Sequence, residues 1–149
     1  MSPGTRGFTF IEMIVVMAIV AIGGMLAIPM IEGGVNSREV RRVARQIFAN
    51  MNHCRSEAIA TGKTEKLHID PHANSMRACG GRWAEFTDRA VIERVEGGLE
   101  AADGSTDIVF YPNGSTSGAR ILIASRQDRY GIRLGVRLDP LIGLPRIEE

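Results

Sequence analysis

The sequence predicts an α+β fold in which one long N-terminal helix packs on a small antiparallel β-sheet body. Three patterns support this prediction. The first is a mostly apolar run from Phe8 to Ile31, and the second is an apolar stripe at helical spacing from Val40 to Ala58. The third is a series of short segments after Gly62 that are separated by turn-forming residues. A helical period followed by period-two alternation is typical of a helix joined to antiparallel strands.

The apolar run from Phe8 to Ile31 is long enough to cross a bilayer as a helix. At about 1.5 Å per residue it would extend roughly 36 Å, and the hydrocarbon core is ~30 Å thick. A helix buried in the protein core is the alternative, but a small domain rarely hides a helix that is apolar on every side. We therefore expect a transmembrane half-helix over residues 8–31 and one small domain over residues 32–149.

Glu12 is the only charged residue in this apolar run. An ionisable group inside a membrane helix is costly, and by default it indicates a function and a partner. Two interpretations stay open at this point. Either Glu12 pairs with a cation from another molecule, or its side chain reaches the membrane interface near the end of the run.

The stretch Arg6-Gly7-Phe8-Thr9-Phe10-Ile11-Glu12 resembles the processing signal of type IV pilins and type II secretion pseudopilins, with Phe10 where Leu is usual. The resemblance implies that residues 1–7 are a leader and that prepilin peptidase cleaves between Gly7 and Phe8. It also implies N-methylation of the new amino terminus at Phe8.

The same resemblance gives Glu12 a partner. In this superfamily the glutamate faces the N-terminal amine of a neighbouring subunit as the subunits stack into a filament. Two charges that are costly alone in lipid become tolerable when they are paired. Pro29 matches a proline that pilins often carry at this depth, where it removes a hydrogen bond and loosens the helix. The resemblance therefore assigns Glu12 and Pro29 to assembly.

The short leader carries Arg6, which favours a cytoplasmic N-terminus and a body on the periplasmic side of the inner membrane. No Ala-x-Ala site for a signal peptidase follows Ile31 before the next helical pattern. We therefore expect a single-pass protein of the inner membrane. In an oxidising periplasm Cys54 and Cys79 could form a disulfide, and the alternative is two unpaired small apolar residues.

The helix is expected to continue from Phe8 to about Thr61, because Gly62 is a good stop signal. The residues that form its apolar stripe are Val40, Val43, Ile47, Met51, Cys54 and Ala58. Strands are expected at Lys66–Asp70, Ser75–Cys79, Arg82–Phe86, Ala90–Val95, Asp107–Tyr111, Arg120–Ala124, Tyr130–Leu138 and Pro145–Glu148.

A tight turn is predicted at Pro112-Asn113-Gly114-Ser115, because Asn-Gly readily adopts the positive φ angles of a hairpin. We expect the strand after this turn to pair back on the strand before it. The turn and the run Arg55-Ser56-Glu57-Ala58-Ile59 also resemble motifs of the GspH/FimT family of minor pseudopilins and pilins.

These resemblances imply a minor pseudopilin of the H type in a type II secretion system. Such a protein would join the tip or body of a periplasmic pseudopilus that drives folded proteins across the outer membrane. The implied partners are other pseudopilins, prepilin peptidase, the assembly platform in the inner membrane, and secreted substrate proteins. No motif for phosphate binding, nucleophilic catalysis or metalloprotease chemistry occurs, so neither an enzyme nor a cofactor is expected.

A nearer alternative is a FimT-like minor pilin of a type IV pilus, whose relatives bind DNA through a C-terminal Gly-Arg-x-Arg tail. Here residues 143–146 read Gly-Leu-Pro-Arg, and two acids follow. The arginines of the last third are Arg120, Arg126, Arg129, Arg133, Arg137 and Arg146. With a net charge of +1 and nearby acids, solvated strand faces are favoured over a phosphate-binding surface, and DNA is not expected as a partner.

A more distant alternative is a membrane-anchored periplasmic enzyme or metal-binding protein. His68, Asp70 and His72 alternate along a strand and turn, and His53 precedes Cys54 upstream. Their spacing matches no structural zinc motif, so we expect surface histidines and no metal site.

Overall fold

The computed structural model describes residues 8–127 and 131–148, without the side chains of residues 25–35. The chain forms two compact units, of which the first ends at Gly34 and the second begins at Val35. The elements are α1 (Phe10–Thr61), β1 (Glu65–Asp70), β2 (Ser75–Ala78), β3 (Trp83–Glu85), β4 (Ala90–Gly97), β5 (Leu99–Glu100), β6 (Thr106–Phe110), β7 (Ala119–Ser125), β8 (Arg133–Leu138) and β9 (Pro145–Glu148).

Helix α1 begins at Phe10 because Thr9 acts as its N-cap. The carbonyl oxygen of Thr9 accepts hydrogen bonds from the backbone N–H groups of Glu12 and Met13, at 3.1 and 3.2 Å. The Thr9 hydroxyl oxygen also accepts from the Glu12 N–H at 3.4 Å. A threonine followed three residues later by a glutamate is a common start of a helix. The helix therefore starts two residues after the predicted start at Phe8.

The apolar side chains of the first unit are exposed wherever the structure describes them, from 44% at Val16 to 84% at Phe10. Among the described residues, no helix combines the length and hydropathy that a membrane crossing requires. Part of the predicted span, residues 25–31, lies outside the described side chains, and so does Pro29.

In the second unit, α1 from Val35 onward presents one buried stripe, as predicted. The fully buried members of the stripe are Val40, Val43, Ala44, Ile47, Met51, Cys54 and Ala58. The helix ends at Thr61, where Gly62 takes a left-handed φ of 68° and donates its N–H to the carbonyl of Ala58 at 3.1 Å. A left-handed glycine just beyond the last turn is a common helix C-cap.

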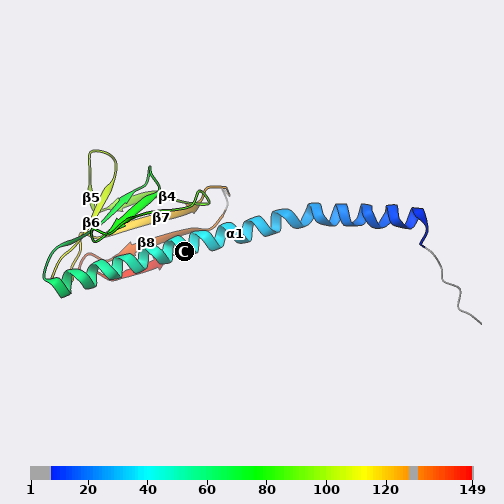
Figure 1. Cartoon of the computed structure of the whole chain (residues 1–149). Helices are drawn as coiled ribbons and strands as arrows, with labels where there is room; N and C mark the ends of the chain where they lie inside the picture. The colour runs from blue at the N-terminus through cyan, green and yellow to red at the C-terminus, as the bar shows by residue number, and fades with distance from the viewer. Residues whose placement is uncertain (1–7, 128–130, 149) are drawn as a thin grey trace, which may run out of the picture. The chain divides into compact units, whose positions relative to one another are not determined.

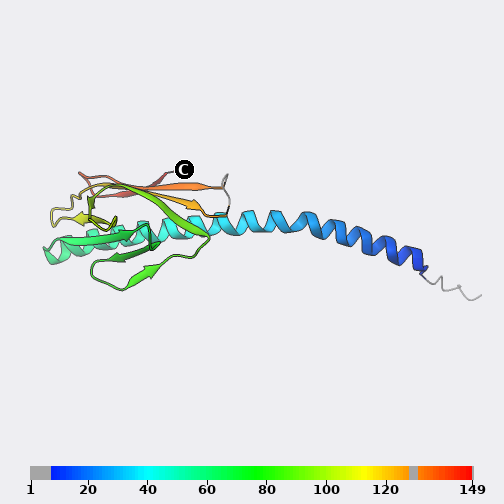
Figure 2. The ribbon, with the colours of Figure 1, turned by 90° about the horizontal axis from the view of Figure 1, so that it is seen from above.

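The β body consists of two antiparallel sheets. One has the strand order β3-β2-β1-β6-β5, and the other has the order β4-β7-β8-β9. In Figure 1 the strands β4, β7 and β8 lie along the cyan part of α1. Figure 2 shows β1–β3 on one side of the helix axis and β7–β9 on the other. The buried stripe of α1 shares one hydrophobic cluster with residues of both sheets.

The predicted hairpin between β6 and β7 is wrong, because the two strands belong to different sheets. Pairing beyond the turn stops at Ser117, whose N–H donates to the Val109 carbonyl at 2.9 Å. Gly118 then takes a φ of 68°, and β7 leaves to pair with β4 and β8. The turn itself has positive φ at Gly114 but not at Asn113, so it lacks the geometry of a two-residue hairpin.

The remaining strand predictions hold with small shifts in their ends. Strand β5 lies where the sequence predicts a loop, and it is a short pairing of Leu99 and Glu100 with β6. Strand β8 begins at Arg133, whereas the predicted start at Tyr130 lies outside the described residues.

Candidate assembly surfaces

The N-terminal unit exposes an apolar helix surface with one carboxylate near its start. Phe8 is 71% exposed, and no described residue hydrogen-bonds or ion-pairs with the Glu12 side chain. Gly23 and Gly24 have open space where a Cβ would lie. Such a surface can pack against other apolar surfaces and can accept a cation from another molecule. Gly7, the other half of the predicted cleavage site, lies outside the described residues.

A disulfide joins α1 to the end of the first β-hairpin. It links Cys54 and Cys79, whose Cα atoms are 5.6 Å apart. Cys54 is fully buried in the helix stripe, and Cys79 follows β2 with a positive φ of 48°. The backbone N–H of Cys79 also donates to the Lys66 carbonyl at 2.9 Å. The bridge therefore attaches the first sheet to the helix beside the core.

The two motifs that resemble the GspH/FimT family meet in space, although 59 residues separate the two that touch. Arg55 donates its Nε–H to the carbonyl oxygen of Gly114 at 3.3 Å. Gly143, from the loop between β8 and β9, approaches both groups so closely that a Cβ there would clash with the Gly114 carbonyl oxygen and lie 2.9 Å from the Arg55 Nε. The motifs therefore hold three chain segments together at the C-terminal end of α1.

Two of the residues weighed as metal ligands, His68 and Asp70, bond other groups. His68 Nδ1 lies 2.7 Å from Asp107 Oδ1, and the Asp70 carboxylate accepts the backbone N–H of His72 at 2.9 Å. Within residues 8–127 and 131–148, no three His, Cys, Asp or Glu side chains are grouped to hold a metal ion.

His68 belongs to a row of polar contacts across the first sheet. Its ring makes an edge contact with Trp83 at 5.1 Å between centroids, and the Arg77 guanidinium lies 4.9 Å from the same indole. Lys66 Nζ lies 2.9 Å from Asp107 Oδ2. Partial burial opposes ionisation of Asp107, but the hydrogen bonds from Lys66 and His68 outweigh it and hold the Asp107 pKa below its ordinary value.

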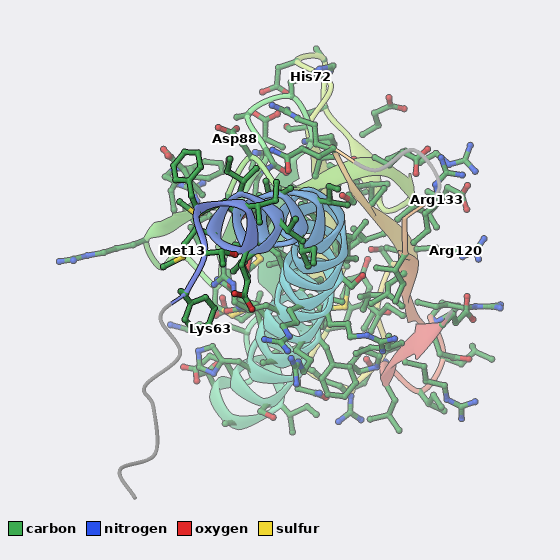
Figure 3. All side chains as sticks on the ribbon, turned by 90° about the vertical axis from the view of Figure 1, so that its right-hand side faces the viewer. Met13, Lys63, His72, Asp88, Arg120 and Arg133 are labelled. Atoms are coloured by element: carbon green, nitrogen blue, oxygen red, sulfur yellow. A yellow bond between two sulfur atoms is a disulfide. The ribbon has the colours of Figure 1, made fainter. Side chains whose placement is uncertain are left out.

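The described arginines on or next to the second sheet mostly have acidic neighbours. Arg126 lies 3.4 Å from Asp88, and Arg133 lies 3.5 Å from Glu93. Figure 3 shows Arg120 and Arg133 extending from the second sheet away from α1. Arg129 lies outside the described residues. Pairing of this kind on exposed strands is the ordinary arrangement of a solvated face.

Sequence analysis missed a buried asparagine that joins the two sheets. Asn74 is 8% exposed with a φ of 49°, and it lies in the turn between β1 and β2. Its Nδ2 donates to the Ala90 carbonyl at 3.0 Å, and its Oδ1 accepts the Ile92 N–H at 3.0 Å. The only local signal was that asparagine tolerates positive φ, which does not reveal that its side chain is buried.

Comparison with known proteins matches both parts of the chain. Residues 3–28 match the prokaryotic N-terminal methylation motif, and residues 43–140 match the family described as type II transport protein GspH. Type II secretion system protein H of Xanthomonas campestris pv. campestris is 30% identical over 144 residues, which cover 91% of this chain and 84% of that protein.

A solved structure shares the fold. The minor pseudopilin EpsH from the type 2 secretion system of Vibrio cholerae superposes with a TM-score of 0.60, over 74% of this chain and 96% of that chain. The two sequences are 13% identical over the match, so this likeness concerns the fold alone. It confirms the predicted α+β class with a long N-terminal helix on an antiparallel body. Together with the match over residues 43–140 and the Xanthomonas relative, these features show that the chain belongs to the GspH family of type II transport proteins.

Proposed function

We propose that the chain works as a minor pseudopilin of a type II secretion system, assembled into the tip or body of a periplasmic filament that drives folded proteins across the outer membrane. Membership of the GspH family supports the assignment to type II secretion. The methylation motif at residues 3–28 supports assembly through the N-terminal helix. The activity proposed here is assembly and not catalysis.

The observation that carries this proposal is the exposed apolar surface of α1, with a glutamate near its start that has no side-chain partner among the described residues. The described apolar side chains from Phe10 to Ile22 are all exposed. In lipid such a surface meets acyl chains, and in a filament it meets the apolar helices of neighbours. Because both surroundings are apolar, packing and polar pairing decide between them. Glu12 supplies the polar pairing.

Processing generates the partner that Glu12 needs. Cleavage between Gly7 and Phe8 by prepilin peptidase leaves a methylated amine at Phe8, and the amine of one subunit then pairs with Glu12 of the next. The Thr9 cap holds Glu12 in the first turn of α1. Glu12 therefore lies at the same end of the helix as the Phe8 amine of its own subunit. Pro29 would loosen the helix as it repacks from lipid into the filament.

We further propose that the chain is anchored in the inner membrane by residues 8–31, with its N-terminus in the cytoplasm and its body in the periplasm. Arg6 in the leader favours this orientation. The disulfide between Cys54 and Cys79 is consistent with an oxidising compartment. The inner-membrane assembly platform and other pseudopilins are the proposed partners, and secreted proteins would be contacted at the filament.

A clean deletion of the gene, complemented with the full chain, tests the function. Release of secreted proteins, twitching motility and DNA uptake are measured in parallel. We expect lost release that the full chain restores, with normal motility and uptake. Normal release with lost motility or uptake would instead assign the chain to a type IV pilus. Intact mass of the mature protein checks that it begins at a methylated Phe8.

A further inference from the structure

Three arginines stand side by side on the second sheet. The register pairs Arg120 of β7 with Arg137 of β8, and Arg137 with Arg146 of β9. Paired residues of neighbouring strands project from the same face, a few ångströms apart, and like charges placed there repel one another. Folding alone does not require three arginines side by side. We therefore expect negatively charged groups to lie near them or to bind them.

The described acidic residues near the row supply only part of that negative charge. Glu148 lies between two of the arginines, 3.3 Å from Arg120 Nε and 3.7 Å from Arg137 Nη1. Glu96 lies 3.8 Å from Arg120 and is closer to Arg94, at 2.9 Å. Asp139 also attracts Arg137 and Arg146, and, after hydrogen bonds from backbone N–H groups, their charges help to lower its pKa. Well-formed bonds between guanidinium and carboxylate are about 2.8 Å long. Because no ion pair of the three arginines with a described residue is shorter than 3.3 Å, their guanidinium groups keep capacity for a closer carboxylate.

Arg146 is the one member of the row without an ion pair among the described residues. None of the described residues forms a hydrogen bond or ion pair with its guanidinium. Together with Arg137, Leu144, Asp139 and Glu148, it lines a shallow hollow of about 260 Å³. Two of the lining residues are acidic, and Glu148 already lies near Arg137. The Arg146 guanidinium beside the apolar Leu144 therefore offers the place in this hollow that suits a carboxylate on a short apolar stem.

A rigid apolar loop lies next to this hollow. Leu141 is 84% exposed and Leu144 is 44% exposed. The Asp139 carboxylate accepts the backbone N–H groups of Leu141 and Ile142, at 2.8 and 3.1 Å, and the Asp139 carbonyl accepts the Gly143 N–H at 2.9 Å. The N–H groups of Ile142 and Leu141 also hold the pKa of Asp139 below its ordinary value. The loop is therefore held in shape while its leucines face solvent, which lowers the entropy cost of binding.

We propose that these residues form a docking surface for a neighbouring pseudopilin that presents carboxylates around an apolar side chain. The surface, called here the C-terminal arginine surface, consists of Arg137, Leu141, Leu144 and Arg146. Charge complementarity selects an acidic partner, and the leucines give it apolar area to bury. This inference rests on the proposed function, and it names the part of the globular body through which the chain is recognised.

Side-chain docking is favoured over addition of a partner strand to β9. Strand β9 is at the edge of its sheet, spans only Pro145–Glu148 and pairs with β8 alone. A short edge strand that begins with proline and carries charges is protected against pairing with another strand. The recognition elements are therefore the guanidinium groups and the leucine side chains.

Photocrosslinking in the full chain tests the surface. Leu141 and Arg146 are replaced one at a time by p-benzoylphenylalanine in cells that carry the whole secretion system, and Arg82, an exposed arginine before β3, is the matched control. We expect positions 141 and 146 to give a product that mass spectrometry identifies as another pseudopilin, and position 82 to give none. No such product at 141 or 146, or an equal yield at 82, would overturn the inference.

Charge reversal tests the chemistry. Arg146→Glu should reduce the crosslink from position 141 about tenfold or more, and Arg82→Glu should leave it unchanged. An acid-to-arginine change at the crosslinked site of the partner should restore it. An undiminished crosslink in Arg146→Glu would contradict docking through charge. Loss of duplex DNA binding in Arg146→Glu, without loss of the crosslink, would replace the partner with nucleic acid.

The two proposals fail in different ways. If the wild-type chain does not restore secretion to the deletion strain, the proposed function is wrong. The other case has three results: the wild-type chain restores secretion, Glu12→Ala abolishes it, and Arg146→Glu leaves both the crosslink and secretion normal. In that case the proposed function stands and the docking surface is wrong. Protease resistance of the periplasmic body, measured in each variant, excludes misfolding as the cause.

Discussion

Glu12 combines a local role and a proposed assembly role. Its backbone N–H bonds Thr9 at the helix start, while its carboxylate has no partner among the described residues. A negative charge in the first turn also suits the helix dipole. The backbone bond needs no particular side chain, so substitution should leave the helix start intact and remove only the charge.

We expect Glu12→Ala to be cleaved and inserted normally and to reduce secretion at least tenfold, because the neighbouring amine then stays unpaired in an apolar interior. Intact mass measures cleavage, and the amount of exoprotein in the medium measures secretion. Glu12→Gln keeps the size of the side chain without its charge, and it should behave like the alanine variant. Normal secretion by Glu12→Ala would contradict the pairing.

Asp107 stabilises the first sheet in a pH-dependent way. Its carboxylate joins Lys66 and His68 on the neighbouring strand β1, and its pKa is lowered in the folded state. A carboxyl group with a lowered folded pKa adds stability above its unfolded pKa, about 3.9. That stability is lost as the pH falls through the folded value.

The corresponding prediction concerns Asp107→Asn. At pH 7 this variant should lose about 1 kcal/mol of unfolding free energy, because the group is partly exposed and its ion pairs are of moderate strength. The difference from wild type should shrink as the pH falls from about 4 through the lower folded pKa, below which the carboxyl group is protonated in both states. Urea denaturation at several pH values measures it, and a difference that does not depend on pH would contradict the ion-pair origin.

At the scale of elements, the disulfide fixes α1 to the first sheet. It closes a loop over a sequence separation of 25 residues. In the chain-entropy account, a loop of this size restrains the unfolded chain by about 3 kcal/mol. Because Cys54 is also fully buried, its sulfur contributes to the core in either redox state.

We expect the double variant Cys54→Ser/Cys79→Ser to lose about 3 kcal/mol of unfolding free energy or more, since it also buries a hydroxyl group. Reducing the wild-type protein should cause most of the same loss. Urea denaturation with and without reductant measures both effects. A midpoint that reductant does not move would show that the bridge adds no stability.

Gly143 tests the contact between Arg55 on α1, the turn at Gly114 and the loop between β8 and β9. Gly143→Ala would place a Cβ against the Gly114 carbonyl and impose a left-handed φ of 64° on alanine. Gly62→Ala has a similar φ of 68° but open space around its Cβ. The two substitutions share the backbone cost, about 1 kcal/mol, and differ in the clash.

Gly143→Ala should therefore be less stable than Gly62→Ala by about 1 kcal/mol or more. Thermal unfolding of the two variants, compared with wild type, measures the difference. Equal destabilisation would mean that the loop moves away from Gly114 without cost, and that the Arg55 contact does not restrain it.

At the scale of the whole molecule, the hydrophobic core and the proposed helix-packing surface belong to different units. The hydrophobic cluster begins at Val40 and ends at Leu138, so it lies within the second unit. The described apolar side chains of the first unit are exposed and available to lipid or to neighbours. Loss of the first unit should therefore affect assembly and not folding.

A fragment that starts at Val35 should fold by itself, because it keeps the entire cluster and the disulfide. We expect one cooperative thermal transition, with a midpoint within about 5 °C of the same domain in the full chain. Circular dichroism of the fragment and of the detergent-solubilised full chain compares them. A fragment that fails to fold would show that residues before Val35 contribute to the core.

Local sequence patterns determined the helix stripe, the helix end at Thr61 and most of the strands. They act between residues that are near in the chain, where periodicity, capping and turn chemistry are strong. The N-terminal methylation motif matched at residues 3–28 is likewise a short contiguous stretch. Each of these features is contained in a short stretch of the chain, so the sequence alone was enough to predict it.

Only the tertiary structure decided which strands pair and which distant residues meet. It separated β6 from β7 into two sheets, buried Asn74 between them, and brought Arg55 to Gly114. It also aligned Arg137 with Arg146 beside the exposed loop. Each of these outcomes depends on how both sheets pack against one helix stripe. The free energy of this packing is shared among residues that are far apart in the chain, so no short stretch of sequence contains it.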